Sequence, residues 1–221
     1  RTHPQTKFIV DKIAEGEIGK IDEIHSTFGF SHRKIDPHSR FFNPKLGGGA
    51  ILDVGCYPVS FSSLVANINV KESELLEPKF LEVSGTICHT GVEECAYATL
   101  EFNNKIRAKV GTAIRLNMKN QTKIIGTNGS ILLNTPWIPE KKSLIEIKTN
   151  NRYYKSFINS EKLLVIYQSA NKSKVNIKKK KKWITFVGKL NRSKGYDIFG
   201  KALIKILNKY KDWKGVVVGD E

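Results

Sequence analysis

The chain has 221 residues, of which 40% are hydrophobic and 10% aromatic, so it can build an ordinary hydrophobic core. This composition excludes wholesale disorder, and no uninterrupted apolar run approaches the roughly 18 residues that a membrane helix needs. The net charge of +16 is unevenly spread. Residues 1–160 hold 21 Lys+Arg against 16 Asp+Glu, whereas residues 161–221 hold 16 against 5, which indicates two parts of different origin.

The three cysteines, Cys56, Cys88 and Cys95, lack the close spacing of a metal site and indicate reduced thiols. No charged and then apolar leader opens the sequence, so we expect a cytoplasmic protein without a membrane span. The most basic run is Lys178–Lys182. Because no aromatic residues interleave it, we expect a solvated linker and no nucleic acid partner; binding to a diphosphate or an anionic lipid headgroup is the alternative.

The first elements in chain order are a helix, a strand and a loop. Residues 3–20 carry apolar side chains at helical spacing and end at glycines, which predicts a short amphipathic helix. Residues 21–30 alternate, with Ile24, Ser26, Phe28 and Phe30 on one face, which predicts a strand. Residues 31–46 contain two prolines and many polar residues, and a second helix is expected over 59–67.

From residue 80 the pattern changes to short alternating segments separated by turn residues. Strands are predicted over 80–90, 94–102, 106–116, 121–127 and 130–134, and asparagine and glycine between them favour hairpins. The fold class is therefore α+β, with helices packed on a large, mainly antiparallel open sheet. Since the sheet is large relative to its helices, another subunit is expected to cover one face.

The last part predicts a different architecture. Residues 183–188 and 214–221 are apolar strands, and residues 196–210 form an amphipathic helix between them. Strand, helix and strand make a truncated α/β (βαβ) unit, which cannot bury both faces of its sheet alone. We therefore expect a domain over 1–162, a basic linker over 163–182 and a partial, at best partly ordered unit over 183–221.

The stretch "GGGAILDVGCYPVSF", residues 47–61, carries the most suggestive chemistry. It is not a dinucleotide fingerprint, because Leu52 stands where the third glycine should be. Asp53 and Tyr57 are four residues apart, so on a helix they share one face. They could form half of an active site, or Asp53 could cap a local turn with Tyr57 in the core. Pro58 predicts a kink or a restart of the helix.

Several motifs in order resemble the C-terminal domain of the Gfo/Idh/MocA oxidoreductases, over residues 1 to about 160. They are "GEIGKI", "LGGGAILDVGCYPVSF", "TGVEECAYATLEF" and "GTNGSILLNTPW". The resemblance is strongest to the dihydrodiol dehydrogenase and glucose–fructose oxidoreductase branch. It implies NAD(P) as cofactor, a sugar or diol as substrate and a homodimer formed through the sheet.

The same resemblance assigns roles to particular residues. The family's aspartate and its tyrosine four positions later fall on Asp53 and Tyr57, so Tyr57 would be the acid–base residue of hydride transfer. Phe28 and Arg40 match positions near the substrate pocket. The family's NAD(P)-binding Rossmann domain and its E-K-P lysine have no match in this sequence. We therefore expect no tightly bound cofactor and no oxidation of diols or sugars by this chain alone.

A second resemblance begins near residue 163. "WITFVGKLNRSKGYDIFGKAL" is similar to the start of the donor-binding domain of GT-B, family-4-type glycosyltransferases. It implies that Gly188, Lys189 and Lys194 contact the diphosphate of a nucleotide sugar. Lys189 stands where the family usually has arginine, and a lysine cannot make the bidentate contact of a guanidinium. The chain thus reads as a join of two incomplete coding regions near residues 160–165, which an intact mass of 24.9 kDa would support.

Three functions remain open on the sequence. The chain is part of an NAD(P)-dependent oxidoreductase, part of a nucleotide-sugar-dependent glycosyltransferase, or a non-catalytic module that only dimerises. Calorimetry with NAD(P) and with UDP- or GDP-sugars distinguishes them, and we expect weak or no binding of either ligand to the chain as it stands.

Overall fold

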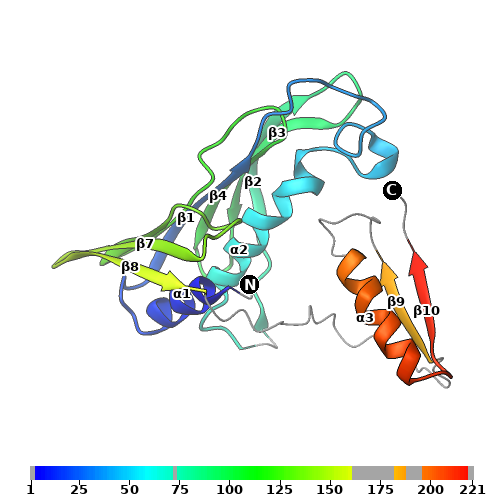
Figure 1. Ribbon diagram of the computed structural model, residues 1–221. Helices are drawn as coiled ribbons and strands as arrows, with labels where there is room; N and C mark the ends of the chain where they lie inside the picture. Colours follow the sequence, from blue (N-terminus) through cyan, green and yellow to red (C-terminus); the bar gives the residue numbers. More distant parts are fainter. Residues whose placement is uncertain (1–2, 72–73, 161–181, 188–195, 219–221) are drawn as a thin grey trace. The chain divides into compact units, whose positions relative to one another are not determined.

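A computed structural model describes residues 3–71, 74–160, 182–187 and 196–218 (Figure 1). The chain divides into two compact units, Arg1–Ile166 and Tyr167–Glu221. The first contains α1 (Pro4–Ala14), β1 (Ile21–Gly29), η1 (Pro44–Leu46), η2 (Ile51–Gly55), α2 (Cys56–Ala66), β2 (Lys79–Ile87), β3 (Glu93–Glu101), β4 (Arg107–Ala113), β5 (Thr122–Gly126), β6 (Gly129–Leu133), β7 (Lys142–Thr149) and β8 (Tyr153–Asn159). The second contains β9 (Trp183–Val187), α3 (Tyr196–Lys209) and β10 (Lys214–Val218).

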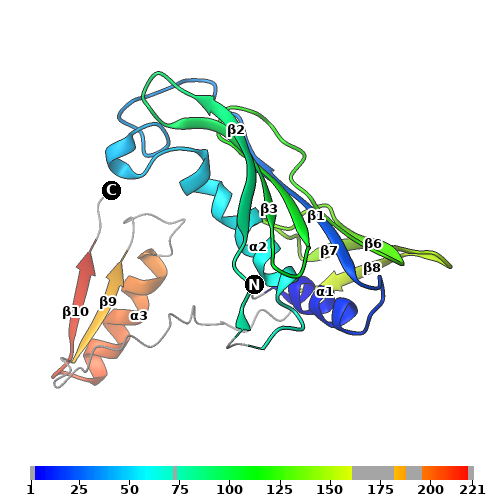
Figure 2. The ribbon, with the colours of Figure 1, turned by 180° about the vertical axis from the view of Figure 1, so that it is seen from behind.

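The first unit is an eight-stranded sheet in the order β2-β3-β4-β1-β5-β6-β7-β8. Every neighbouring pair is antiparallel except β1 and β4, which run parallel at the centre. Figure 2 shows the strands from behind. The predicted fold class, helices on a large and mainly antiparallel sheet, is confirmed.

Two strands were missed by the sequence analysis, which ended the sheet near residue 134. β7 and β8 form a hairpin at its far edge, with Ile145 paired to Ser156. Residues 142–149 do alternate, since Ser143, Ile145 and Ile147 are buried. The asparagine pair at 150–151 between two such runs is a hairpin signal that could have located both strands.

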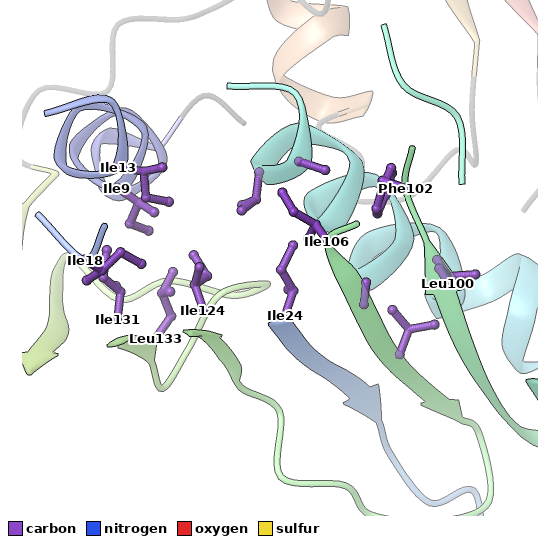
Figure 3. Packing of buried hydrophobic residues seen from close by; sticks show 14 of the residues in the cluster. Ile9, Ile13, Ile18, Ile24, Leu100, Phe102, Ile106, Ile124, Ile131 and Leu133 are labelled. Atoms are coloured by element: carbon purple, nitrogen blue, oxygen red, sulfur yellow. The ribbon is translucent and has the colours of Figure 1, made fainter. Parts of the chain in front are cut away.

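The core of this unit lies between the sheet and both helices, α1 and α2. Ile9 and Ile13 of α1 and Val65 of α2 join one buried cluster with strand residues such as Ile24 and Ile124 (Figure 3). Burial of Ile24, Ser26 and Phe28 confirms the predicted inner face of β1. A second cluster contains Phe28, Phe42, Ala50, Val54, Cys88, Val92 and Ile114. Because Ala50 and Val54 belong to this second cluster, it anchors the glycine-rich stretch of residues 47–61.

The strand β2 lies at the other end of the sheet and differs from the strands inside it. All nine of its residues are exposed, and Phe80 and Val83 are 68% and 67% exposed. Its register to β3 shifts between Phe80 and Glu82 and again between Thr86 and Ile87. In the described part of the chain, β2 has a strand partner on one side only.

A carboxylate ties the end of α1 to the β7–β8 hairpin. Glu17 accepts hydrogen bonds from Arg152 Nη2 at 2.5 Å and from the Tyr154 hydroxyl at 2.9 Å. The hydrogen bond from Arg152 is the main reason that the pKa of Glu17 lies below its ordinary value. The pKa of Tyr154 is raised, chiefly by burial and also by its bond to Glu17.

This contact predicts an acid-sensitive part of the stability. A carboxyl whose pKa is lowered by folding stabilises the fold at pH values above its unfolded pKa, ordinarily about 4.5, and loses that contribution as the pH falls through the folded pKa. We expect Glu17→Gln to lower the urea midpoint at pH 7 and to differ less from the wild type at pH 3. Asp22→Asn, which changes an exposed carboxylate, is the control. If the urea midpoints of Glu17→Gln and the wild type differ by the same amount at pH 7 and at pH 3, the Glu17 carboxylate does not make this contribution.

The second unit is a parallel strand pair joined by a helix. Val216 of β10 pairs with Thr185 of β9, and Phe186 contacts Phe199 of α3 with ring centroids 5.2 Å apart. Gly215 lies against Leu203 of α3, where a Cβ would come within 2.5 Å of that side chain. The predicted βαβ unit is confirmed.

One described stretch, Pro44–Ala66, has the length and hydropathy that a membrane-crossing helix needs: it has 23 residues, and its most apolar window of 18 residues has a mean hydropathy of 1.3. Lysine, aspartate, glycine and serine residues interrupt its apolar runs, so no uninterrupted run marks it in the sequence. Core helices of soluble proteins meet the same criteria, and 44% of the most apolar window is buried. The stretch is also divided among η1, a glycine turn, η2 and α2. It is therefore weak evidence for a span.

Candidate functional site

The glycines of residues 47–49 form a tight turn that leads into η2. Gly47 and Gly49 have φ values of +71° and +109°, left-handed conformations that glycine adopts without strain. The N–H groups of Gly48 and Gly49 donate to the carbonyls of Asn43 and Phe41, both at 2.9 Å. The turn confirms the expectation that these glycines bend the backbone closely and begin a helix.

The helix that follows starts as a π-helix. Asp53 lies in the π-helical η2, and Tyr57 is the second residue of α2. The change from π to α geometry comes before Pro58 and not at it. Pro58 is the third residue of α2 and lies inside a helical segment that begins at Ile51, so it has no N–H to donate to a carbonyl of the preceding turn. Single π turns of this kind occur frequently at functional sites.

Two of the predicted site residues form an ion pair. Arg40 Nη1 donates to Asp53 Oδ1, with the Asp53 side chain 13% exposed and that of Arg40 54% exposed. The Arg40 guanidinium also lies over the ring of Phe41, 3.9 Å from its centroid. It is held on two sides, and its other N–H groups have no protein partner among the described residues. Arg40 is thus a fixed cation that can still donate to a ligand.

The other two predicted residues meet through their rings. Tyr57 packs edge-on against Phe28 with centroids 5.2 Å apart, and Phe28 is only 8% exposed. Tyr57 is 44% exposed, and its hydroxyl has no hydrogen-bond partner in the described part of the chain. Phe28 therefore supports the Tyr57 ring, whose hydroxyl is free to bind a ligand.

Trp137 completes this aromatic group and was not singled out by the sequence analysis. Its ring stacks on Phe28 at 5.9 Å and meets Tyr57 edge-on at 6.2 Å. Its Nε1–H donates to the carbonyl of Thr27 at 2.8 Å, which fixes the indole on β1. A tryptophan just after a strand, within a quoted motif, was the available signal. The Phe28 and Trp137 rings hold Tyr57 in one orientation.

A separate apolar groove of about 360 Å³ lies between the η2–α2 segment and strands β2, β3 and β4. It is lined by Ile51, Leu52, Cys56, Val59, Phe80 and Val83, together with residues of β3 and β4. None of the four predicted site residues of the first unit lines it. The groove is therefore distinct from the Tyr57 site.

The remaining predicted site residues, Gly188, Lys189 and Lys194, lie outside the described residues. Their assignment to a sugar donor stays a prediction. Among the residues that the structure describes, no group of three or more His, Cys, Asp or Glu side chains could hold a metal ion.

Comparison with known proteins places this geometry in a family. The fold of the first unit is that of the C-terminal part of several oxidoreductases. The profile of the GFO/IDH/MocA C-terminal domain matches residues 8–132, more than half of the chain. The chain therefore belongs to the Gfo/Idh/MocA family.

Curated relatives agree. The chain is 31% identical over 128 residues to trans-1,2-dihydrobenzene-1,2-diol dehydrogenase of Xenopus tropicalis, covering 58% of this chain and 36% of that protein. It is 30% identical over 151 residues to an uncharacterized oxidoreductase, ORF334, of Rhizobium meliloti, covering 68% of this chain and 42% of the relative. The chain thus spans less than half the length of these relatives.

Solved structures share the fold. A mutant of KijD10, a 3-ketoreductase from Actinomadura kijaniata in complex with TDP-benzene and NADP, superposes with a TM-score of 0.62 at 19% identity, covering 71% of this chain and 46% of that one. An aldose-aldose oxidoreductase from Caulobacter crescentus, complexed with glycerol, superposes with a TM-score of 0.59 at 17% identity, covering 70% and 44%. At these identities the likeness concerns the fold.

Proposed function

We propose that the chain provides the substrate side of an NAD(P)-dependent oxidoreductase that acts on a sugar or diol, with Tyr57 as the acid–base residue. The observation that carries the proposal is the half-exposed Tyr57 side chain, whose ring is held by Phe28 and Trp137. The dihydrodiol dehydrogenase relatives and the ketoreductase and aldose oxidoreductase folds support the substrate class.

Proton transfer is the step that this chain's residues can perform. In oxidation, Tyr57 accepts the proton of the substrate hydroxyl while the neighbouring C–H hydrogen leaves with its electron pair as hydride. In reduction, the phenol donates its proton to the carbonyl oxygen. The nicotinamide cofactor supplies the hydride acceptor or donor. The Tyr57 hydroxyl fits this chemistry because it is accessible and has no protein partner in the described residues.

In this scheme Arg40 and Asp53 bind and orient the substrate. Asp53 fixes the Arg40 guanidinium by their ion pair, and Arg40 directs its free N–H groups to oxygen atoms of the substrate. The sequence has no G-x-G-x-x-G motif, and in this proposal a separate domain binds the phosphates of the dinucleotide. The homodimer implied by the family stays a prediction, which sedimentation velocity tests.

The proposal predicts activity once a cofactor domain is present. We define the fused oxidoreductase as a protein of two parts. The first is the part of KijD10 that does not superpose on this chain, and the second is this chain, joined at Arg1. We expect it to couple NADP(H) turnover to xylose, glucose or a dihydrodiol, measured by absorbance of NADPH. The chain alone and the KijD10 part alone are the controls. A fused protein that binds NADP but turns over none of these substrates would favour a non-catalytic module.

A further inference from the structure

One peptide group at the entrance of η2 is held from both sides. The carbonyl of Ala50 accepts a hydrogen bond from Thr112 Oγ1 of β4 at 2.9 Å. The N–H of Ile51, which belongs to the same peptide group, donates to Glu93 Oε1 of β3 at 2.8 Å. Because a peptide group is planar, two bonds on its opposite edges fix its plane.

The Glu93 carboxylate also lies directly beside Gly49. A Cβ on Gly49 would come within 2.6 Å of Glu93 Oε1 and 2.7 Å of Oε2. At φ +109° a side chain there would be strained even without this contact. The carboxylate thus occupies the space beside Gly49. It also places a negative charge at the start of the η2–α2 segment, where helix N–H groups favour an anion.

We infer that Glu93, together with Thr112, is a positioning residue for the Asp53–Tyr57 pair. Neither touches Asp53 or Tyr57 through any hydrogen bond in the described residues. They act through the 50–51 peptide, which sets the direction in which η2 leaves the glycine turn. Asp53 follows two residues later, and Tyr57 follows at the beginning of α2.

The effect of this clamp on Tyr57 can be measured without turnover. In chain labelled with fluorotyrosine, the Tyr57 resonance is identified by its loss in Tyr57→Phe. Since the Tyr57 ring lies edge-on to Phe28 at 5.2 Å, its fluorine shift reports small changes in ring position. We expect Glu93→Ala to shift or broaden this resonance and to leave the other tyrosine resonances in place.

Matched variants separate positioning from a general loss of structure. Glu93→Gln retains the acceptor oxygen and is expected to restore the wild-type Tyr57 resonance. Thr112→Val removes the other bond at nearly constant shape and is expected to act like Glu93→Ala, whereas Thr112→Ser is expected to retain the resonance. Glu94→Ala is the control, because this adjacent carboxylate lies near Arg115, at 3.6 Å, and not near the 50–51 peptide.

Turnover gives a second readout, and this part of the inference rests on the proposed function. In the fused oxidoreductase, Glu93→Ala is expected to lower kcat by about 10- to 100-fold while KM for NADP stays constant, because small misplacements of a reacting group reduce the rate steeply. An unchanged Tyr57 resonance in both Glu93→Ala and Thr112→Val would overturn the inference. A shifted resonance in a fused protein without any turnover supports the inference and counts against the proposed function instead.

Discussion

Tyr57→Phe is expected to lower kcat/KM of the fused oxidoreductase by about 10²- to 10⁴-fold, the range that a positioned general acid or base contributes. Phenylalanine keeps the ring that packs on Phe28 and Trp137 but cannot accept or donate the substrate proton. Because the Tyr57 hydroxyl has no hydrogen-bond partner in the described residues, removing it leaves no protein group unpaired. Thermal stability should therefore stay close to that of the wild type while the rate falls.

Tyr97→Phe is the matched control for this loss of rate. Tyr97 is 41% exposed, close to the 44% of Tyr57, and its Cα partner on β4 is Gly111. The same chemical change at Tyr97 should leave kcat/KM within a factor of about two, as for surface substitutions away from special features. Comparable losses of kcat/KM in the two variants, or full activity of Tyr57→Phe, would contradict an acid–base role for Tyr57.

Ile124→Ala is expected to reduce the free energy of unfolding by about 2–5 kcal/mol. Ile124 lies on β5 with no exposed surface, and its neighbours across the sheet are Ile24 on β1 and Ile131 on β6, which are also fully buried. Truncation would remove apolar contacts and leave a cavity between these strands and α1. Urea unfolding followed by circular dichroism measures the change.

Ile138→Ala provides the comparison, because Ile138 is 76% exposed. The same truncation there should change the free energy of unfolding by no more than about 0.5 kcal/mol. Equal effects at the two positions would mean that the centre of the sheet does not carry the stability that its burial indicates.

The sequence predicted the fold well where signals are local. Alternation located β1 to β6, and the apolar strands with an amphipathic helix located the βαβ unit. The parallel pairing of β1 with β4 could not be predicted, because it joins residues such as Ile24 and Ala108 that are far apart in the chain. The β7–β8 hairpin, by contrast, was overlooked although its alternation and its asparagine turn were visible.

For the candidate site, too, the features that depend on nearby residues could be predicted, and the pairings of distant residues could not. The spacing of Asp53 and Tyr57 placed both on one helical segment, and the resemblance named Phe28 and Arg40 as well. What the sequence could not reveal is which residues come together: Arg40 with Asp53, and Trp137 with Tyr57. Such pairs depend on how a loop and distant strands meet. The π geometry of η2 likewise has no local sequence signature that predicts it.

In the described part of the chain, β2 leaves one edge of the sheet open to pairing with another strand. Its outer edge has no strand partner in the described residues, and Phe80 and Val83 add apolar surface beside it. Edges of this kind recruit strands from other molecules and start aggregation. Lys79 and Glu82 place charges along β2, the means by which natural sheets discourage such recruitment. Lys79 and Glu82 are thus expected to discourage strand pairing at β2, beside the exposed apolar side chains of Phe80 and Val83.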